Sequence, residues 1–186
     1  PSDRRVVVMP VARHIADDLR YGFHATWNRV ADDYPAKAEM LANLLVNGVE
    51  FYDYFPAHGK YAPTEEVYEF EPFYGGKIHA RDIKGKIDAG HDRGMLAIAY
   101  VAAYAASASV YRAHPFPMTN SAGEPLVFNG AVMSERETDA RGLEKWFWMM
   151  AIARDSPWHA HILEEWRRTL DEAPADFAAF DGLEID

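Results

Sequence analysis

The sequence of 186 residues contains no cysteine, which excludes disulfide bonds, thiolate nucleophiles and zinc sites built on cysteine. Long hydrophobic runs are also missing. The longest apolar stretches, such as residues 95–106, are well short of the ~20 residues that span a bilayer, so we expect no membrane span. No charged-then-apolar leader opens this stretch of chain, so no signal peptide is expected in it.

Basic residues are fewer than acidic ones. Lysine and arginine number 19 against 29 aspartates and glutamates, which gives a formal net charge of −10. Such a chain repels phosphate backbones, so nucleic acid is not expected as a partner. Apolar residues make up 49% of the chain and aromatic residues 13%. This is enough to bury a substantial core, and the composition therefore predicts a globular fold.

Recognisable cofactor and metal motifs are absent as well. The eight histidines match no metal-binding pattern, and the motifs HExxH and GxSxG do not occur. Gly75-Gly76-Lys77 lacks the other parts of a phosphate-binding loop. We therefore expect neither a metal ion nor an organic cofactor.

What the chain does contain is an alternation of apolar strands and amphipathic helices. Pro35 and Asp155-Ser156-Pro157 mark helix starts, since serine or aspartate caps a helix and proline fits its first turn. Asn47-Gly48 and Gly94 mark helix ends. The predicted strands are residues 21–25, 49–55, 95–100 and 177–186. The apolar stripes predicted for the helices are Met40, Leu41, Leu44 and Leu45, then Ile83 and Ile87, then Ile162, Leu163, Trp166 and Leu170.

This order of elements is typical of a parallel α/β architecture with right-handed crossovers. A closed (β/α)₈ TIM barrel takes ~250 residues, so four strands correspond to about the first half of one. The connections after strands two and three are long, while those before each strand are short, which favours a partial barrel over a doubly wound sheet. Residues Arg5 to Ala12 read as a short additional strand followed by a polar connector.

The last predicted strand carries two candidate site residues. Alternate side chains of a strand share a face, so Glu184 and Asp186 point one way while Leu183 and Ile185 point the other. The apolar pair should meet the helices, and the acidic pair should face the barrel interior with Asp186 nearest the C-terminal mouth. An aspartate there can act as a nucleophile on a sugar or stabilise positive charge. The alternative is a solvated carboxylate at the chain end.

A second candidate group follows the predicted strand 49–55. Asp53 lies between Tyr52 and Tyr54, and His58 follows in the same loop. Aromatic rings beside a carboxylate suit carbohydrate, because sugar C–H faces pack on rings while hydroxyls bond the acid. Aromatic residues at strand ends also serve simple packing, so both interpretations stay open.

Four short motifs resemble, in order and approximate spacing, glycoside hydrolase family 66, which contains dextranases and cycloisomaltooligosaccharide glucanotransferases. They are residues 20–23 (RYGF), 47–53 (NGVEFYD), 89–95 (AGHDRGM) with Ala99-Tyr100, and 180–186 (FDGLEID). The resemblance implies that residues 20–186 form the N-terminal half of a glycosidase barrel. It also implies that residues 1–19 are the end of a preceding β-sandwich domain and its connector. By the same resemblance the parent protein is bacterial and secreted or attached to the cell surface.

The resemblance further implies a retaining double-displacement mechanism on α-1,6-linked glucan. The family's nucleophile falls on Asp186, and its acid/base glutamate lies on a later strand, beyond this chain. The implied substrate-binding residues are Asp53, His58, Tyr52, Lys60, Tyr100 and Glu184. The pattern departs from the family at Tyr54, Ala57, Val101 and Glu184.

The sequence therefore leaves three hypotheses of function open. The first is a fragment of a retaining glycoside hydrolase or transglycosylase on α-glucan, whose partners are an oligosaccharide or polysaccharide and either the remainder of the barrel or a second copy of the chain. The second is a non-catalytic carbohydrate-binding or structural α/β module. The third, a flavodoxin-like domain, predicts an anion-binding glycine loop after the first strand, and residues 24–28 contain none.

Overall fold

The structure is a computed structural model of the 186-residue chain. It describes residues 19–24, 33–52, 54–69, 77–128, 147–171 and 180–186. The predicted strand Arg5 to Ala12 and nearly all of the predicted segment 1–19 lie outside these residues.

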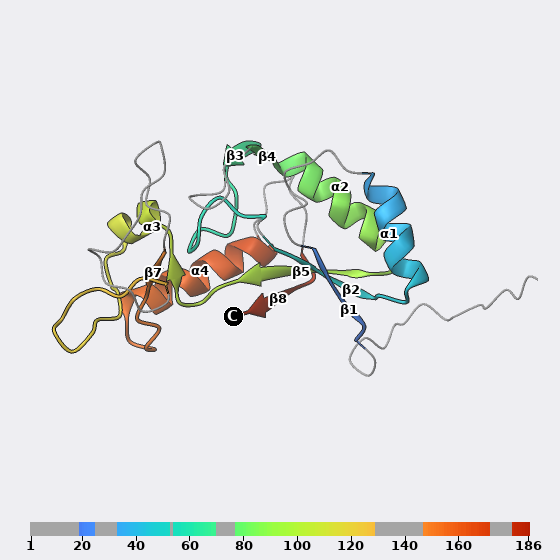
Figure 1. The fold of residues 1–186 in the computed structure, drawn as a ribbon. Helices are drawn as coiled ribbons and strands as arrows, with labels where there is room; N and C mark the ends of the chain where they lie inside the picture. Colours follow the sequence, from blue (N-terminus) through green and yellow to red (C-terminus); the bar gives the residue numbers. More distant parts are fainter. Residues whose placement is uncertain (1–18, 25–32, 53, 70–76, 129–146, 172–179) are drawn as a thin grey trace, which may run out of the picture.

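A four-stranded parallel sheet forms the centre of the molecule (Figure 1). Its strands follow one another in space as they do in the chain, in the order β1-β2-β5-β8. This sequential order of parallel strands confirms the predicted partial barrel and argues against a doubly wound sheet, in which the strand order reverses. The strands are β1 (Tyr21–His24), β2 (Gly48–Phe51), β5 (Leu96–Val101) and β8 (Gly182–Ile185).

Two helices, α1 (Tyr34–Asn43) and α2 (Ala80–His91), lie side by side against the same face of the sheet (Figure 1). Their predicted positions are confirmed. The side chain of Asp33 caps α1 by accepting from the N–H of Ala36 at 3.1 Å. However, the buried residue of α1 is Ala38, whereas Met40, Leu44 and Leu45 of the predicted stripe are exposed.

The end of α1 differs from the predicted stop at Asn47-Gly48. The N–H of Val46 donates to the carbonyl of Leu41 at 3.0 Å, and the N–H of Leu45 donates to that of Ala42 at 2.9 Å. This is the Schellman pattern, in which the residue after the cap adopts a left-handed conformation. Leu45 does so with φ 64°, a conformation that costs any residue with a Cβ atom free energy.

Helix α4 (Pro157–Asp171) begins as predicted, with proline in its first position. The hydroxyl of Ser156 accepts from the N–H of His159 at 3.1 Å and so caps the helix. The predicted buried stripe is wrong in part, because Leu163 and Leu170 are exposed. The buried side chains follow the helical period from the first turn instead: Trp158, Ile162, Glu165 and Thr169.

The long connections contain structure that the sequence interpretation missed. The predicted second strand of residues 49–55 ends at Phe51, and the connection after it contains the antiparallel pair β3 (Val67–Glu69) and β4 (Lys77–His79). The connection after β5 contains the antiparallel pair β6 (Ala105–Ala106) and β7 (Trp148–Met149) with the short helix α3 (Ala108–Ala113). These last elements project at the end of the molecule opposite α1 (Figure 1).

Gly59 shows how tightly the connection after β2 packs on α4. Its φ is +83°, and a Cβ atom there would lie 2.6 Å from the Trp158 ring and 3.0 Å from Val110. The indole N–H of Trp158, a fully buried residue, donates to the carbonyl of Ala103 at 2.8 Å. The connections after β2 and β5 are therefore fixed to each other through α4.

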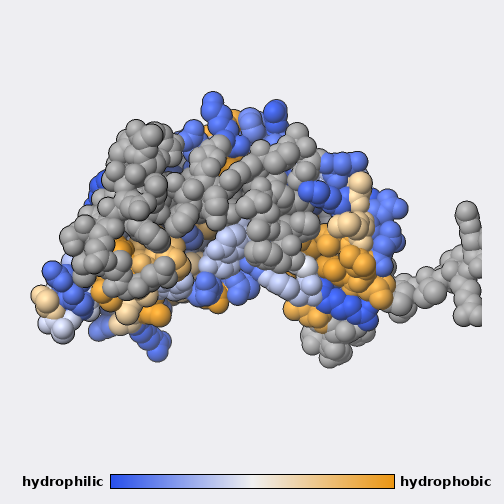
Figure 2. Space-filling model, in the orientation of Figure 1, coloured by the Kyte–Doolittle hydropathy of each residue, from blue (hydrophilic) through white to orange (hydrophobic). Residues whose placement is uncertain are grey.

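Both outer strands of the sheet are open within the described residues, since β1 pairs only with β2 and β8 only with β5. Figure 2 shows apolar surface near β1 and the end of α1. Exposed apolar side chains there are Leu19, Tyr21, Met40, Leu44 and Leu45. No helix of the described segments has both the length and the apolar character to cross a bilayer.

Candidate active site

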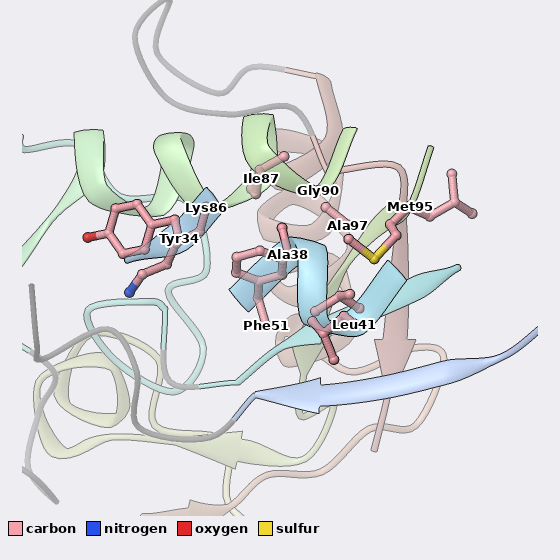
Figure 3. A pocket seen from close by; sticks show the side chains of 11 residues that line it. Tyr34, Ala38, Leu41, Phe51, Lys86, Ile87, Gly90, Met95 and Ala97 are labelled. Carbon is pink, nitrogen blue, oxygen red and sulfur yellow. The ribbon is translucent and has the colours of Figure 1, made fainter. Parts of the chain in front are cut away.

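The side chains of β2 and β5 alternate between the two faces of the sheet. Val49, Phe51 and Ala97 face α1 and α2, where they line an open crevice of about 310 Å³ (Figure 3). Glu50 and Tyr100 therefore point to the opposite face, which we call the inner face. The crevice contains the Lys86 ammonium 4.9 Å from the centre of the Tyr34 ring, and it lies on the other side of the sheet from the candidate site.

The carboxyl ends of β2, β5 and β8 meet at one edge of the sheet because the strands are parallel. Beyond β8 the N–H of Asp186 donates to the carbonyl of Val101 at 3.0 Å, and the Asp186 carbonyl accepts from the N–H of Ala103 at 3.0 Å. Asp186 is thereby held in line with β8. This edge is the rim on which β/α barrels carry their functional groups.

Tyr100 joins the side chain of Asp186 to β5. Its hydroxyl donates to Oδ2 of Asp186 at 2.7 Å. Burial and this hydrogen bond raise the pKa of Tyr100 well above its usual range, so the hydroxyl keeps its proton and remains a donor. Burial and the nearby Asp186 carboxylate raise the pKa of Tyr104 as well. The Tyr100 hydroxyl thus holds one oxygen of the Asp186 carboxylate.

Tyr52 extends this group of side chains to the end of β2. Its ring centroid lies 4.2 Å from that of Tyr100, with an angle of 48° between the rings. Tyr52 is half-buried, so part of its ring faces solvent. The sequence interpretation selected Tyr52, Tyr100 and Asp186 separately, and the structure brings the three together.

Two further carboxyls lie near Asp186. Glu184 is half-buried and is the register partner of Tyr100, and burial followed by the Asp186 charge raises the pKa of Glu184. Glu50, which the sequence interpretation missed, is only 3% exposed. Burial, then the charges of Glu184 and Asp186, raise the pKa of Glu50 to about 7. The alternation of Glu50 and Tyr52 with the apolar Val49 and Phe51 was the signal that could have found it.

His58 and Lys60 belong to the connection after β2, and Asp53 lies outside the described residues. His58 is buried, with ring centroids 5.1 Å from Phe55 and 4.7 Å from Phe147. Burial lowers the pKa of His58 to about 3, so its imidazole is neutral under ordinary conditions. Lys60 is half-buried, and its N–H donates to the carbonyl of Ala57 at 2.9 Å.

Across the segments that the structure describes, no three histidine, aspartate or glutamate side chains gather in a way that could hold a metal ion. The groups present on the inner face are carboxyls, phenols and aromatic rings at a strand end. Such a set can attack or stabilise an electrophilic carbon and can pack on a sugar ring.

A comparison with protein families gives a match to glycosyl hydrolase family 66 over residues 7–186. The chain belongs to this family. A search of curated proteins found no match.

Solved structures show the same fold for this family 66 chain. A Paenibacillus sp. cycloisomaltooligosaccharide glucanotransferase, complexed with cycloisomaltoheptaose, matches with a TM-score of 0.67 and 20% identity, over 94% of this chain and 24% of its own. A maltogenic α-amylase from Thermotoga neapolitana matches with a TM-score of 0.56 and 12% identity, over 90% and 38% of the two chains. An α-galactosidase from Thermus thermophilus matches with a TM-score of 0.51 and 14% identity, over 90% of this chain and 30% of its own. The family 66 chain thus spans between about a quarter and two fifths of these proteins.

A departure from the family pattern is expected from the sequence at four residues. Of these, Tyr54, Ala57 and Val101 are buried. Glu184 lies near Asp186 on the inner face, where it adds a carboxyl to the site.

Proposed function

We propose that this chain supplies the nucleophile of a retaining glycoside hydrolase or transglycosylase that acts on α-glucan, with α-1,6-linked, dextran-like chains as the substrate class. The observation that carries the proposal is the position of Asp186. It follows β8 at the rim of the parallel strands and accepts a 2.7 Å hydrogen bond from the Tyr100 hydroxyl. Carboxylates of barrel glycosidases act from this rim.

In the proposed reaction Asp186 attacks the anomeric carbon of the sugar, and the bond to the leaving oxygen breaks. A general acid gives that oxygen its proton, and a covalent glycosyl ester on Asp186 remains. Water or a sugar hydroxyl then attacks the anomeric carbon and gives its proton to the deprotonated general acid. The bond between that carbon and the Asp186 oxygen breaks, which restores both the carboxylate and the general acid. The first acceptor gives hydrolysis and the second gives transglycosylation.

The general acid of this reaction must lie ~5 Å from the nucleophile and on the other side of the bond that breaks. Glu184 is two residues from Asp186 on one strand, so the two side chains point in parallel and do not bracket a glycosidic bond. We therefore place the general acid on a later strand of the complete barrel and assign Glu184 to substrate binding.

The proposed sugar contacts surround Asp186. The exposed part of the Tyr52 ring offers an apolar surface beside the reacting carboxylate, and it lies against the ring of Tyr100. Asp53, His58 and Lys60 are proposed to contribute from the connection after β2. The buried His58 would act there by supporting the connection between Phe55 and Phe147.

The open edges of β1 and β8 also need a partner, because unpaired strand edges and apolar side chains are costly to leave in water. We propose that the remaining strands of the barrel cover them. In a preparation of this chain alone, a second copy would take their place. Sedimentation analysis of the isolated chain should then show dimers, and a stable monomer would contradict association between copies.

The test of the proposed function compares the complete parent protein with its Asp186→Asn variant on dextran and other α-glucans. We expect the variant to lose at least about a thousandfold in kcat/KM. Asp88→Asn, an exposed position on α2 that pairs with Lys84, is the matched control and should leave activity unchanged. Unchanged turnover in the Asp186 variant would eliminate the nucleophile. Binding without turnover in the unmodified protein would favour the carbohydrate-binding module instead.

A further inference from the structure

Glu50 is a buried carboxyl that the proposed reaction does not use. It is 3% exposed and lies on β2 between the buried Val49 and Phe51. Fully buried glutamates are rare unless a cation pairs with them. In the described part of the chain, no lysine, arginine or histidine forms an ion pair with Glu50.

The groups that face Glu50 offer it no positive charge. The carboxyls of Glu184, on β8, and of Asp186, directly after it, both raise the pKa of Glu50. On β5 its register partner is Ile98, and on β1 the partner is Phe23, neither of which titrates. Burial and the two carboxylates raise the pKa of Glu50 to about 7, so a proton stays on this carboxyl at pH values where exposed carboxyls are ionised.

Three carboxyls on one inner face cannot all be ionised at low cost, and their surroundings differ. Glu50 is the most buried of them, whereas Asp186 is exposed at the rim and accepts a hydrogen bond from the Tyr100 hydroxyl. A shared proton resides where a negative charge would be least solvated. We propose that Glu50 is a positioning residue, a neutral carboxylic acid below the rim that adds no further negative charge beneath Asp186 and so lets Asp186 keep its hydrogen bond with Tyr100.

This proposal rests on the proposed function and predicts what happens when Glu50 loses its proton. A third negative charge on the inner face repels Glu184 and Asp186 and weakens the approach of Asp186 to Tyr100. Turnover should then fall with increasing pH above neutrality. The Glu50→Gln variant keeps the shape of the neutral acid without the ability to ionise, so it should keep the activity of the wild type at pH 6 and lack the decline.

A direct test is a carbon NMR titration of the complete protein with ¹³C-labelled glutamate carboxyls, assigned through bonds to the backbone. We expect the Glu50 carboxyl to titrate near neutral pH, well above the ordinary range of glutamate, and the signal of the exposed Glu39 of α1 serves as the reference. If Glu50 titrates together with Glu39, the proposal is overturned whether or not the protein has turnover. This readout therefore separates a failure of the Glu50 proposal from a failure of the proposed function.

The activity arm compares kcat/KM at pH 6 and pH 8.5 in the wild type, in Glu50→Gln and in the control Glu39→Gln. We expect kcat/KM to fall severalfold from pH 6 to pH 8.5 in the wild type and in the control. In Glu50→Gln we expect the same kcat/KM at both pH values. Equal pH responses in all three proteins would contradict the proposal. A loss of tenfold or more in folded Glu50→Gln at pH 6 would also contradict it, because it would show that the ionised carboxylate is required.

Discussion

The stability of the protein should depend on the ionisation of Glu50 in a way that Glu50→Gln removes. Burial and the neighbouring carboxylates raise the pKa of Glu50 from 4.5 to about 7 in the folded state. Between these pH values the folded protein holds a proton that the unfolded chain releases, so the free energy of unfolding falls as the pH rises and levels off above pH 7. At 1.36 kcal/mol for each pH unit, the loss is about 3 kcal/mol.

The assay is urea denaturation of the wild type and of Glu50→Gln at a series of pH values from 4 to 8. The difference between the two free energies of unfolding should grow by about 3 kcal/mol in favour of Glu50→Gln across this range. Taking the difference removes the titration of all other groups that the two proteins share. The control Glu39→Gln, at an exposed position of α1, corrects for the change in net charge. A difference that stays constant with pH would refute the reasoning.

Four further substitutions, one of them a matched control, test local features of the fold and the site. Gly59→Ala should cost about 3 kcal/mol in urea denaturation, because it adds a clash with Trp158 to an unfavourable φ. Gly123→Ala, which has a similar φ of +81° and open space around it, should cost only about 1 kcal/mol, and equal costs would contradict the clash. Leu45→Gly should raise the free energy of unfolding by about 0.5 kcal/mol, because it relieves the left-handed backbone, and a loss would contradict this. Tyr100→Phe should lower kcat/KM on dextran on the order of tenfold, and unchanged kinetics would rule out a role for its hydroxyl.

The order of the elements could be predicted because local patterns decide it. The strand at residues 95–100 is a nearly continuous apolar run that only a strand covered on both faces explains. The start of α4 is also encoded locally, because the Ser156 hydroxyl caps the helix and Pro157 fits its first position. The resemblance to family 66 added the prediction of a partial barrel, and the parallel sheet, whose strands follow their order in the chain, agrees with that prediction.

Features that depend on contacts between distant residues could not be predicted. Leu45 adopts the left-handed conformation at a position where glycine is usual. Because a leucine gives no signal for this conformation, the turn could not be predicted from the sequence. The buried face of α4 starts from Trp158, whose indole N–H donates to Ala103 in the turn after β5. The predicted stripe began at Ile162 instead and included Leu163 and Leu170 in error.

The candidate site divides in the same way. The alternation along β8 predicted that Glu184 and Asp186 share a face, and this needed only the period of a strand. The hydrogen bond of Asp186 with Tyr100 required the pairing of β5 with β8, which the sequence does not encode locally. Glu50 was not predicted because the carboxyls that face it come from the end of β8, and they reach it only through the pairing of β2, β5 and β8.

Covalent trapping tests the role of Asp186 most directly. An α-glucosyl fluoride with a second fluorine on its ring needs little help from a general acid, and the second fluorine slows the release of the sugar from the enzyme. Mass spectrometry of the digested protein should find the fluorinated sugar on the peptide that contains Asp186, and the Asp186→Asn variant should remain unlabelled. A sugar attached to any other residue, or a protein that turns over α-glucan without ever being labelled at Asp186, would contradict the account.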